Sequence, residues 1–294
     1  MTALVVLATG PLVLVEDSGR PGLAAVGVGR SGAADRTAHR LGARLVGHPE
    51  DRAALEILLG GLTVRAVGRI IMAVTGAPAP ATLDGRPVAH ATLVEVPDGG
   101  VLTLAMPASG LRTYLTVRGG IDVPPVLGSR STDTLSGLGP PAVMAGDVLP
   151  VGAPGARFPT VDHAPQHATT RQDGPVVLEV LPGPRPDWVG GGDTGLGGLL
   201  GVDRAVAGET DRVGLRLGGP PVRRAAARQG AELPTEGMVR GAVQVPPGGE
   251  PVVFLADHPV TGGYPVVGVL TASSCDRAAQ LRPGEPVRLV AARG

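Results

Sequence analysis

Glycine and proline interrupt this 294-residue chain so often that only short secondary-structure elements fit between them. The 47 glycines and 30 prolines would by themselves suggest disorder. However, 43% of the residues are hydrophobic and the formal net charge is zero, so the chain can bury enough apolar surface to fold. We therefore interpret these residues as turns between many short strands, which is typical of a protein that is mainly β with a few short helices.

Apolar runs of strand length follow one another closely between residues 54 and 117. Turn residues such as Gly60-Gly61 and Asp84-Gly85 separate these runs. Close spacing with few helices between the strands predicts antiparallel sheet or barrel rather than alternating β-α-β units.

Two helices are predicted from apolar periodicity and capping residues. The first lies near residues 33–46, with Ser31 as its N-cap and Gly47 at its end. The second covers residues 275–281 and has Ser274 as its N-cap.

The chain is expected to form two lobes. Residues 156–175 show no hydrophobic periodicity and are typical of an inter-domain linker. The boundaries are approximate: an N-terminal β-rich lobe over residues 1–155 contains the helix near 33–46, and a C-terminal lobe covers residues 176–294.

Composition excludes several classes of site. All 26 basic residues are arginine, so neither a Schiff-base lysine nor a P-loop lysine exists here, and phosphates must be held by Arg and backbone N–H groups. Zero net charge and five aromatic residues argue against nucleic acid as a partner. The single Cys275 fits a reducing cytoplasm, and no apolar run approaches the roughly 18 residues of a membrane span.

The highest density of candidate functional residues lies within residues 232–270. Three valine-rich runs, 238–245, 252–256 and 265–270, predict a meander of buried strands. Because loops at strand ends commonly carry function, the polar residues between the second and third runs are candidates, namely Asp257, His258, Thr261, Gly262, Gly263 and Tyr264. The alternative is a hairpin loop whose Asp and His satisfy only local backbone groups.

Other motifs carry weaker signals. Residues 27–32 match G-x-G-x-x-G, but no β-α-β repeats follow, so a dinucleotide site is disfavoured. Two interpretations of this segment remain. One is an anion site at the helix N-terminus, with Arg20, Arg30 or Arg36 as ligands. The other is a simple capped turn. Pro165 lies between His163 and His167 and argues against a helical metal pair, so no metal is predicted.

Several segments follow the order found in one known family. They are residues 16–22, 31–36, 55–57, 117–124, 127–134, 211–214, 236–237 and 256–265. From about residue 16 to 290 the chain resembles the carboxyltransferase-type family that contains allophanate hydrolase subunit 2, the C subunit of 5-oxoprolinase and the sporulation-kinase antagonist regulator.

The resemblance implies a cyclophilin-like β-barrel architecture, with the barrel in the C-terminal lobe. It also implies a partner of the subunit 1 type or the B type, a possible third LamB/YcsF-type subunit, and ATP-dependent hydrolysis of a small amide such as 5-oxoproline. One alternative is the carboxyltransferase component of a biotin-dependent urea or amide carboxylase. Biotin would then be carried by another chain, because this one has no lysine. A second alternative is a non-catalytic regulatory subunit that sequesters its partner.

The site residues are expected among the polar positions of the matching segments. His258 is the candidate general acid or base, with Asp257 nearby. Adjacent strand residues point to opposite faces, so these two share a site only if the chain bends, which Pro259 allows. The candidate substrate or anion ligands are Arg118, Arg130, Ser131, Asp133, Thr261, Gly262, Gly263, Tyr264, Arg20, Ser31, Asp35 and Arg36.

Overall fold

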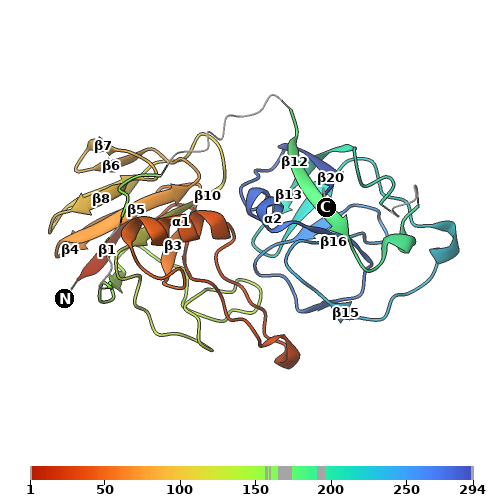
Figure 1. Ribbon diagram of the computed structural model, residues 1–294, viewed down its shortest axis with the longest axis horizontal. Helices are drawn as coiled ribbons and strands as arrows, with labels where there is room; N and C mark the ends of the chain where they lie inside the picture. The colour runs from red at the N-terminus through yellow and green to blue at the C-terminus, as the bar shows by residue number, and fades with distance from the viewer. Residues whose placement is uncertain (1, 156–157, 159, 165–173, 191–195, 293–294) are drawn as a thin grey trace. The chain divides into compact units, whose positions relative to one another are not determined.

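The computed structural model describes residues 2–155, 158, 160–164, 174–190 and 196–292 (Figure 1). It divides into two compact units, Met1–Arg20 with Ser31–Thr170 and Pro21–Arg30 with Arg171–Gly294. Strands dominate both units, and the described residues include two α-helices, which confirms the prediction of a mainly β protein. Much of the expected linker, 156–175, lies outside the described residues, so the predicted domain boundaries stay a prediction.

The first unit contains two antiparallel sheets. One sheet has the strand order β11-β1-β4-β9-β6-β7, with the bounds Val148–Pro150, Ala3–Ala8, Thr63–Val67, Val101–Leu104, Ala81–Leu83 and Arg86–Val88. The other has the order β2-β3-β10-β5-β8, with the bounds Leu12–Glu16, Ala54–Leu58, Arg112–Val117, Ile70–Gly76 and Leu93–Val96.

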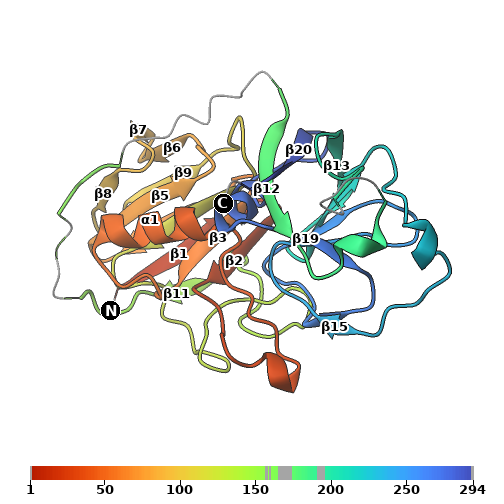
Figure 2. The ribbon, with the colours of Figure 1, turned by 45° about the vertical axis from the view of Figure 1, so that its right-hand side comes forward.

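Strand alternation separates an apolar face from a polar face in the five-stranded sheet. Leu55 and Ile57 of β3 and Leu115 and Val117 of β10 join one hydrophobic cluster with residues of the six-stranded sheet, such as Leu4. Because successive side chains point to opposite faces, the residues between them face the other way. Helix α1 (Arg36–Val46) packs against β5 and β10 and lies across this sheet (Figure 2).

The ends of α1 are set by local capping. Asp35 is the N-cap, and its side chain accepts a hydrogen bond from the N–H of Ala38 at 2.9 Å. The prediction of Ser31 as the cap is therefore wrong, because the helix begins later and Ser31 Oγ donates to the carbonyl of Thr132. The predicted end is confirmed, since Gly47 adopts the left-handed conformation with φ of 69°.

The second α-helix, α2, covers Ala272–Ala278. Its N-cap is Thr271, whose side chain accepts from the N–H of Ser274, so the prediction of Ser274 as the cap over 275–281 is wrong. Thr and Ser are both good caps, and here the earlier hydroxyl captures the first free amides.

The second unit forms a closed barrel of seven strands in the order β12-β19-β16-β17-β14-β13-β20, which confirms the barrel prediction. The bounds in that order are Val176–Pro182, Val266–Leu270, Ala242–Gln244, Val252–Phe254, Gly214–Gly218, Asp203–Thr210 and Pro286–Ala291. Strands β12 and β20 pair in parallel and the other pairs are antiparallel. Three short 3-10 helices also occur among the described residues, at Ala24–Val26, Pro186–Trp188 and Ala226–Arg228.

The predicted meander has a different strand order. Strand β16 lies between β17 and β19, because Val243 pairs with Val253 on one side and with Gly268 on the other. The free edge of β17 pairs with β14 instead of β19. A two-stranded ribbon of β15 (Glu236–Gly237) and β18 (Thr261–Gly262) holds the loop between β17 and β19.

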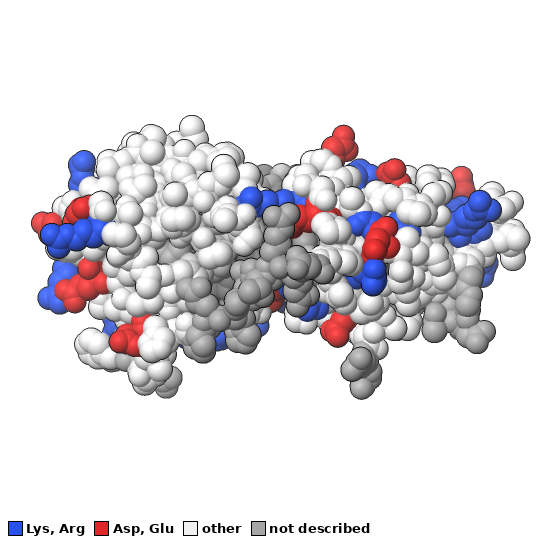
Figure 3. Space-filling model, turned by 90° about the horizontal axis from the view of Figure 1, so that it is seen from above, with Lys and Arg blue, Asp and Glu red and all other residues white. Residues whose placement is uncertain are grey.

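The described surface is mixed in charge. On the face shown in Figure 3, acidic and basic side chains occur near one another and most of the surface is uncharged. Among the described residues, no helix combines the length and apolar character that a bilayer-spanning segment needs.

The close contact between α1 and β10 yields a stability prediction. A Cβ at Gly42 would come within 2.3 Å of Thr116 Oγ1. Alanine gains about 1 kcal/mol over glycine in a helix, whereas overpacking costs about 1–3 kcal/mol. We expect Gly42→Ala to lower the free energy of unfolding measured in urea.

The matched control is Gly42→Ala combined with Thr116→Ala, which removes the clashing hydroxyl. Thr116 Oγ1 has no hydrogen-bond partner among the described residues, so its loss breaks no such bond. The double variant should be less destabilised than the sum of the two single variants. A stabilising effect of Gly42→Ala alone would contradict the close packing of this helix.

Candidate functional site

A row of polar side chains occupies the α1-facing side of the five-stranded sheet. Arg112, Tyr114 and Thr116 alternate along β10 with the core residues Leu115 and Val117. In the sheet register Tyr114 lies opposite Glu56 of β3. Antiparallel partners share a face, so the sheet itself brings these polar groups together.

The Glu56 carboxylate is the centre of this row. Its Oε2 accepts hydrogen bonds from the Tyr114 hydroxyl at 2.7 Å and from the N–H of Ala34 at 2.9 Å. Its Oε1 lies 3.3 Å from Arg112 Nε, and the Tyr114 oxygen accepts from the N–H of Asp35 at 2.8 Å. Burial, reinforced by the nearby carboxylate, raises the pKa of Tyr114 well above its usual value of 10.0, so the phenol stays protonated.

A second buried network, the Asp17–serine cluster, consists of Asp17, Gly19, Ser129, Arg130 and Ser131. Asp17 Oδ1 accepts from the hydroxyls of Ser129 and Ser131 at 2.6 Å each and from the N–H of Gly19 at 2.7 Å. Asp17 Oδ2 accepts from the N–H of Arg130 at 2.6 Å. The proton of the Ser131 hydroxyl is therefore directed into the protein.

Arg20, beside this cluster, has N–H groups that make no hydrogen bond to the described residues. Its side chain is 2% exposed, and its Nη2 donates to the carbonyl of Ser131. Arg20 Nε and Nη1 are buried and have no hydrogen-bond partner among the described residues. Because unused donors on a buried cation are costly, Arg20 is the predicted anion ligand that the geometry of the first unit best supports.

Arg118 and Arg130, also predicted as anion ligands, donate to nearby protein groups. Arg118 donates to the carbonyls of Val46 and Gly155 at 2.9 Å each, so it binds the C-terminal end of α1. Arg130 donates to the carbonyl of Val123 at 2.7 Å and pairs with Asp122 at 2.8 Å. These contacts support a role in fixing loops, and anion binding by either residue stays a prediction.

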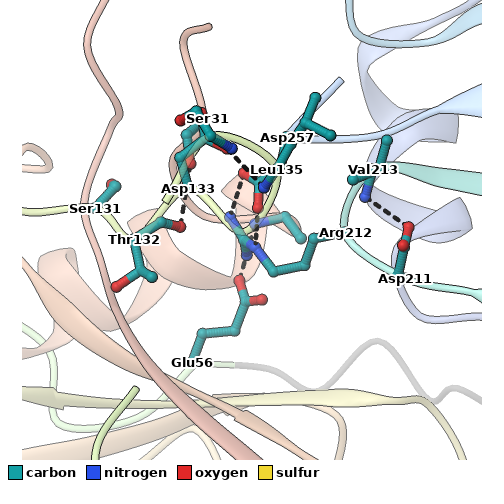
Figure 4. Close-up of polar contacts among 12 residues, drawn as sticks. Ser31, Glu56, Ser131, Thr132, Asp133, Leu135, Asp211, Arg212, Val213 and Asp257 are labelled. Carbon is teal, nitrogen blue, oxygen red and sulfur yellow. Dashed lines mark hydrogen bonds and ion pairs between the residues drawn. The ribbon is translucent and has the colours of Figure 1, made fainter. Parts of the chain in front are cut away.

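The remaining candidates of the first unit shape its loops. Ser31 is buried with φ of 54°, a left-handed conformation that is strained for a residue other than glycine. Asp35 is the N-cap of α1, and Arg36 is the first residue of the helix. Asp133 Oδ1 accepts from the N–H of Leu135 at 2.9 Å (Figure 4). It also accepts from the N–H of Ser136 at 3.0 Å.

In the second unit, Asp257 is engaged by Arg212. The guanidinium donates from Nε to Oδ2 at 2.8 Å and from Nη2 to Oδ1 at 3.0 Å, with both side chains buried (Figure 4). Such a bidentate pair fixes both oxygens of the carboxylate. It supports a structural role for Asp257.

His258 lies in a more open environment. It is partly exposed, its Nδ1 is 2.8 Å from the carbonyl of Pro259, and its ring centroid is 6.5 Å from that of Phe254. Because a carbonyl only accepts hydrogen bonds, Nδ1 carries the proton and Nε2 is the basic position of the neutral ring. A shared pocket for His258 and Asp257 stays a prediction.

Gly262 allows the two-stranded ribbon to lie close to the barrel. A Cβ at Gly262 would come within 2.7 Å of Gln244 Nε2, which donates to the carbonyl of Tyr264 at 3.0 Å. Thr261 and Gly263 are exposed, and the Tyr264 side chain is 46% exposed.

Glu56 and Tyr114 are not among the candidate residues expected from the sequence. The available signal was a single acid inside the apolar run Leu55-Glu56-Ile57. Among the described residues, no group of His, Cys, Asp or Glu side chains could hold a metal ion. His167 of the disfavoured pair with His163 lies outside the described residues.

The buried ion pair Arg212–Asp257 yields a stability prediction. Replacing Asp257 by Asn removes the carboxylate charge that faces the buried Arg212 guanidinium, and breaking a buried ion pair in this way typically costs about 3–5 kcal/mol. We expect urea denaturation of Asp257→Asn to show a loss of this size. The control is Arg216→Met, which breaks an exposed pair with Glu209 and should cost under about 1 kcal/mol. Equal small losses in both variants would contradict the structural role of Asp257.

Two buried histidines of the first unit yield a pH prediction. Burial lowers the pKa of His39 and of His48 below the usual 6.5. In the unfolded chain both take up protons below pH 6.5, whereas in the folded chain they do so only at lower pH. The free energy of unfolding should therefore be unaffected by these groups above that pH and fall as the pH drops below it.

Urea denaturation across this pH range tests the expectation. The pH dependence should be weaker in His39→Gln. Thr75→Val removes a buried hydrogen bond to the carbonyl of Ala38 without removing a titratable group, so it should shift the whole curve and keep its slope. An unchanged slope in His39→Gln would show that this histidine contributes nothing to it.

Comparisons with known proteins cover nearly the whole chain. A family model described as "Carboxyltransferase domain, subdomain A and B" matches residues 26–291. The C subunit of 5-oxoprolinase from Escherichia coli (strain K12) is 33% identical over 301 residues, which cover 98% of this chain and 90% of that protein.

Solved structures agree in fold. TTHA0988 superposes with a TM-score of 0.86 at 33% identity, covering 99% of this chain and 56% of that chain. The urea amidolyase of K. lactis superposes with a TM-score of 0.87 at 29% identity, covering 98% of this chain and 18% of that chain. This chain thus spans just over half of TTHA0988 and less than a fifth of the urea amidolyase. The family resemblance expected from the sequence is confirmed, and the chain belongs to the family of carboxyltransferase domains with subdomains A and B.

Proposed function

We propose that this chain is a subunit of a heteromeric, ATP-dependent 5-oxoprolinase, or of an allophanate hydrolase-like complex that cleaves an amide C–N bond. The observation that carries the proposal is the match to the C subunit of 5-oxoprolinase across 98% of this chain and 90% of that relative. Similarity along nearly the whole of both sequences supports a shared role more strongly than a match to 18% of a urea amidolyase.

The proposed substrate is a small amide with an anionic group, such as 5-oxoproline. An amide resists hydrolysis, so its cleavage requires activation of the carbonyl, for which ATP is the proposed second substrate of the complex. Because the chain has no lysine, the permanently charged side chains that can bind an anion are its arginines, and backbone N–H groups can assist them. In the first unit, the unused Nε and Nη1 of Arg20 are such groups. The N–H groups of Gly262 and Gly263 are proposed as a separate candidate in the second unit.

His258 is the proposed general acid or base. Its Nδ1–H is fixed by the carbonyl of Pro259, which makes Nε2 the position that exchanges a proton. Asp257 is proposed to act only indirectly, by fixing the chain beside His258 through its pair with Arg212.

The second candidate function is the carboxyltransferase component of a biotin-dependent urea or amide carboxylase. The TM-score of 0.87 with the K. lactis urea amidolyase favours it. Biotin would arrive on another chain, since this one has no lysine to carry it.

The proposed partners are a B-type subunit of 5-oxoprolinase and a LamB/YcsF-type subunit, both from the same cytoplasm. The test is co-expression of all three and measurement of glutamate and ADP released from 5-oxoproline and ATP. We expect turnover from the full complex and none from this chain alone. Turnover by the isolated chain, or by its partners without it, would overturn the subunit role.

Two other outcomes separate the alternatives. Carboxylation of urea by this chain with a biotinylated carrier, and no reaction with 5-oxoproline, would favour the carboxylase. Tight binding to the B-type partner without either activity would favour a regulatory role.

His258→Ala tests the proposed acid–base role in the same complex. We expect activity to fall by about 10²-fold or more, while co-purification of the subunits persists. The matched control is His163→Ala, because the His163 side chain is 74% exposed and pairs with the neighbouring Asp162. Near-normal turnover of His258→Ala at equal complex concentration would leave His258 as a loop residue.

A further inference from the structure

The six-stranded sheet of the first unit has one face in the hydrophobic core and one face outside it. Leu4 and Val6 of β1 and Val64 and Ala66 of β4 belong to the core cluster. Because successive side chains of a strand point to opposite faces, the residues between them point away from the core. The two α-helices of the described residues pack elsewhere, α1 against β5 and β10 and α2 against β12.

This second face carries aliphatic side chains where an antiparallel sheet that meets water normally carries polar ones. The sheet register aligns Val5 with Val148 on one side and with Arg65 on the other, and Arg65 in turn with Val101. Exposed fractions are 59% for Val148, 38% for Val67 and 37% for Leu7. We name this surface the outer face, and it consists of Val5, Leu7, Arg65, Val67, Val101 and Val148.

Arg65 is the one charged residue of the outer face. It is exposed and makes no hydrogen bond or ion pair to a described residue. It is the middle residue of β4 (Thr63–Val67), a strand with neighbours on both sides in the sheet. Exposed aliphatic residues around a cation without a counter-charge match a protein surface that is apolar and bears a carboxylate.

A second copy of this chain matches the outer face poorly. In a two-fold symmetric dimer the same patch serves both subunits, so a residue at its centre lies near its own copy. Arg65 would then face another Arg65, and juxtaposed like charges oppose association. A non-identical chain avoids this cost. The matched region is 56% of TTHA0988, so further polypeptide accompanies it in that protein.

The edges of the same sheet are unsuited to strand addition. The edge strands β11 and β7 have three residues each, and each contains a proline, Pro150 and Pro87. Proline lacks the N–H that a new strand would need, and short edges offer few other groups. Association through this sheet is therefore expected at its face.

We propose that the outer face is the docking surface for another subunit of the complex, a folded chain that presents an apolar surface with a carboxylate opposite Arg65. The proposal rests on the proposed function, which supplies the other subunits. It adds where on this chain one of them binds and which chemistry its surface must have.

Arg65→Glu and Val148→Glu are the test variants. The first reverses the charge that the partner's carboxylate would meet, and the second places a charge on the apolar part of the outer face. Both side chains are exposed, so each variant should fold and keep a melting temperature close to that of the wild type.

Arg86→Glu is the matched control for the charge reversal. Arg86 is an exposed arginine of the same sheet, but it pairs with Leu83, which packs against the core cluster. Paired residues share a face, so Arg86 lies on the opposite side from the outer face. Val239→Glu is the control for Val148→Glu, because Val239 is a valine of the second unit with a similar exposure of 53%.

The measurement is calorimetric titration of the purified chain with the B-type subunit, with the LamB/YcsF-type subunit and with both together. We expect binding to the wild type, a Kd raised about ten-fold or more in both test variants, and an unchanged Kd in both controls. Binding that both test variants retain would overturn the proposal, and so would a lack of binding in all three titrations of the wild type.

Sedimentation of the chain alone tests the second copy as the occupant. A wild-type dimer that Val148→Glu dissociates would overturn the proposal in favour of self-association. Turnover of 5-oxoproline by the complex separates this inference from the proposed function. Normal turnover with unimpaired binding of both test variants removes only the docking surface, whereas weakened binding in a complex without turnover removes only the proposed activity.

Discussion

The first unit depends on one buried carboxylate. Glu56 lies on a strand whose neighbouring residues, Leu55 and Ile57, enter the hydrophobic core, so its side chain must point toward α1. There it joins β3 to β10 through Tyr114 and Arg112 and joins both strands to the segment before α1. A buried charge is tolerated only with several directed partners, and these partners come from two separate stretches of chain, β10 and the segment before α1. The carboxylate therefore fixes the relative positions of the sheet and the helix entry.

The second unit also contains a buried carboxylate, that of Asp257, which is stabilised by a bidentate pair with Arg212. Asp257 and Arg212 neutralise each other, and the backbone N–H of Asp257 also donates to the carbonyl of Arg212 at 2.9 Å. The pair joins the ends of two neighbouring strands, because Arg212 precedes β14 and Asp257 follows β17. The chain then turns at His258 and Pro259 into the ribbon strand β18. The rigid ion pair thus determines where His258 can lie.

Long apolar runs make the presence of strands predictable from the sequence. The pairing of strands and the capping residues of the helices are not predictable in this way. Strands β3, β5 and β10 lie within residues 54–117, where closely spaced apolar runs predict strands. Strands β6 and β13 carry little hydrophobic signal, the first because it has three residues and the second because it contains Asp203, Arg204 and Glu209. The position of β16 between β17 and β19 follows from closure of the barrel, a long-range constraint that local pattern does not carry.

For the candidate site, sequence identifies residue types but not where their hydrogen bonds go. Three of the four arginines predicted to bind anions in the first unit, Arg20, Arg118 and Arg130, look equivalent as sequence because each lies beside glycine or serine. Folding distinguishes them. Arg118 donates to the end of a helix and Arg130 to a carboxylate and a carbonyl, while Arg20 donates once and retains Nε and Nη1. A guanidinium recognises an anion through its unused N–H groups, so Arg20 is the one of these three arginines that we propose as an anion ligand.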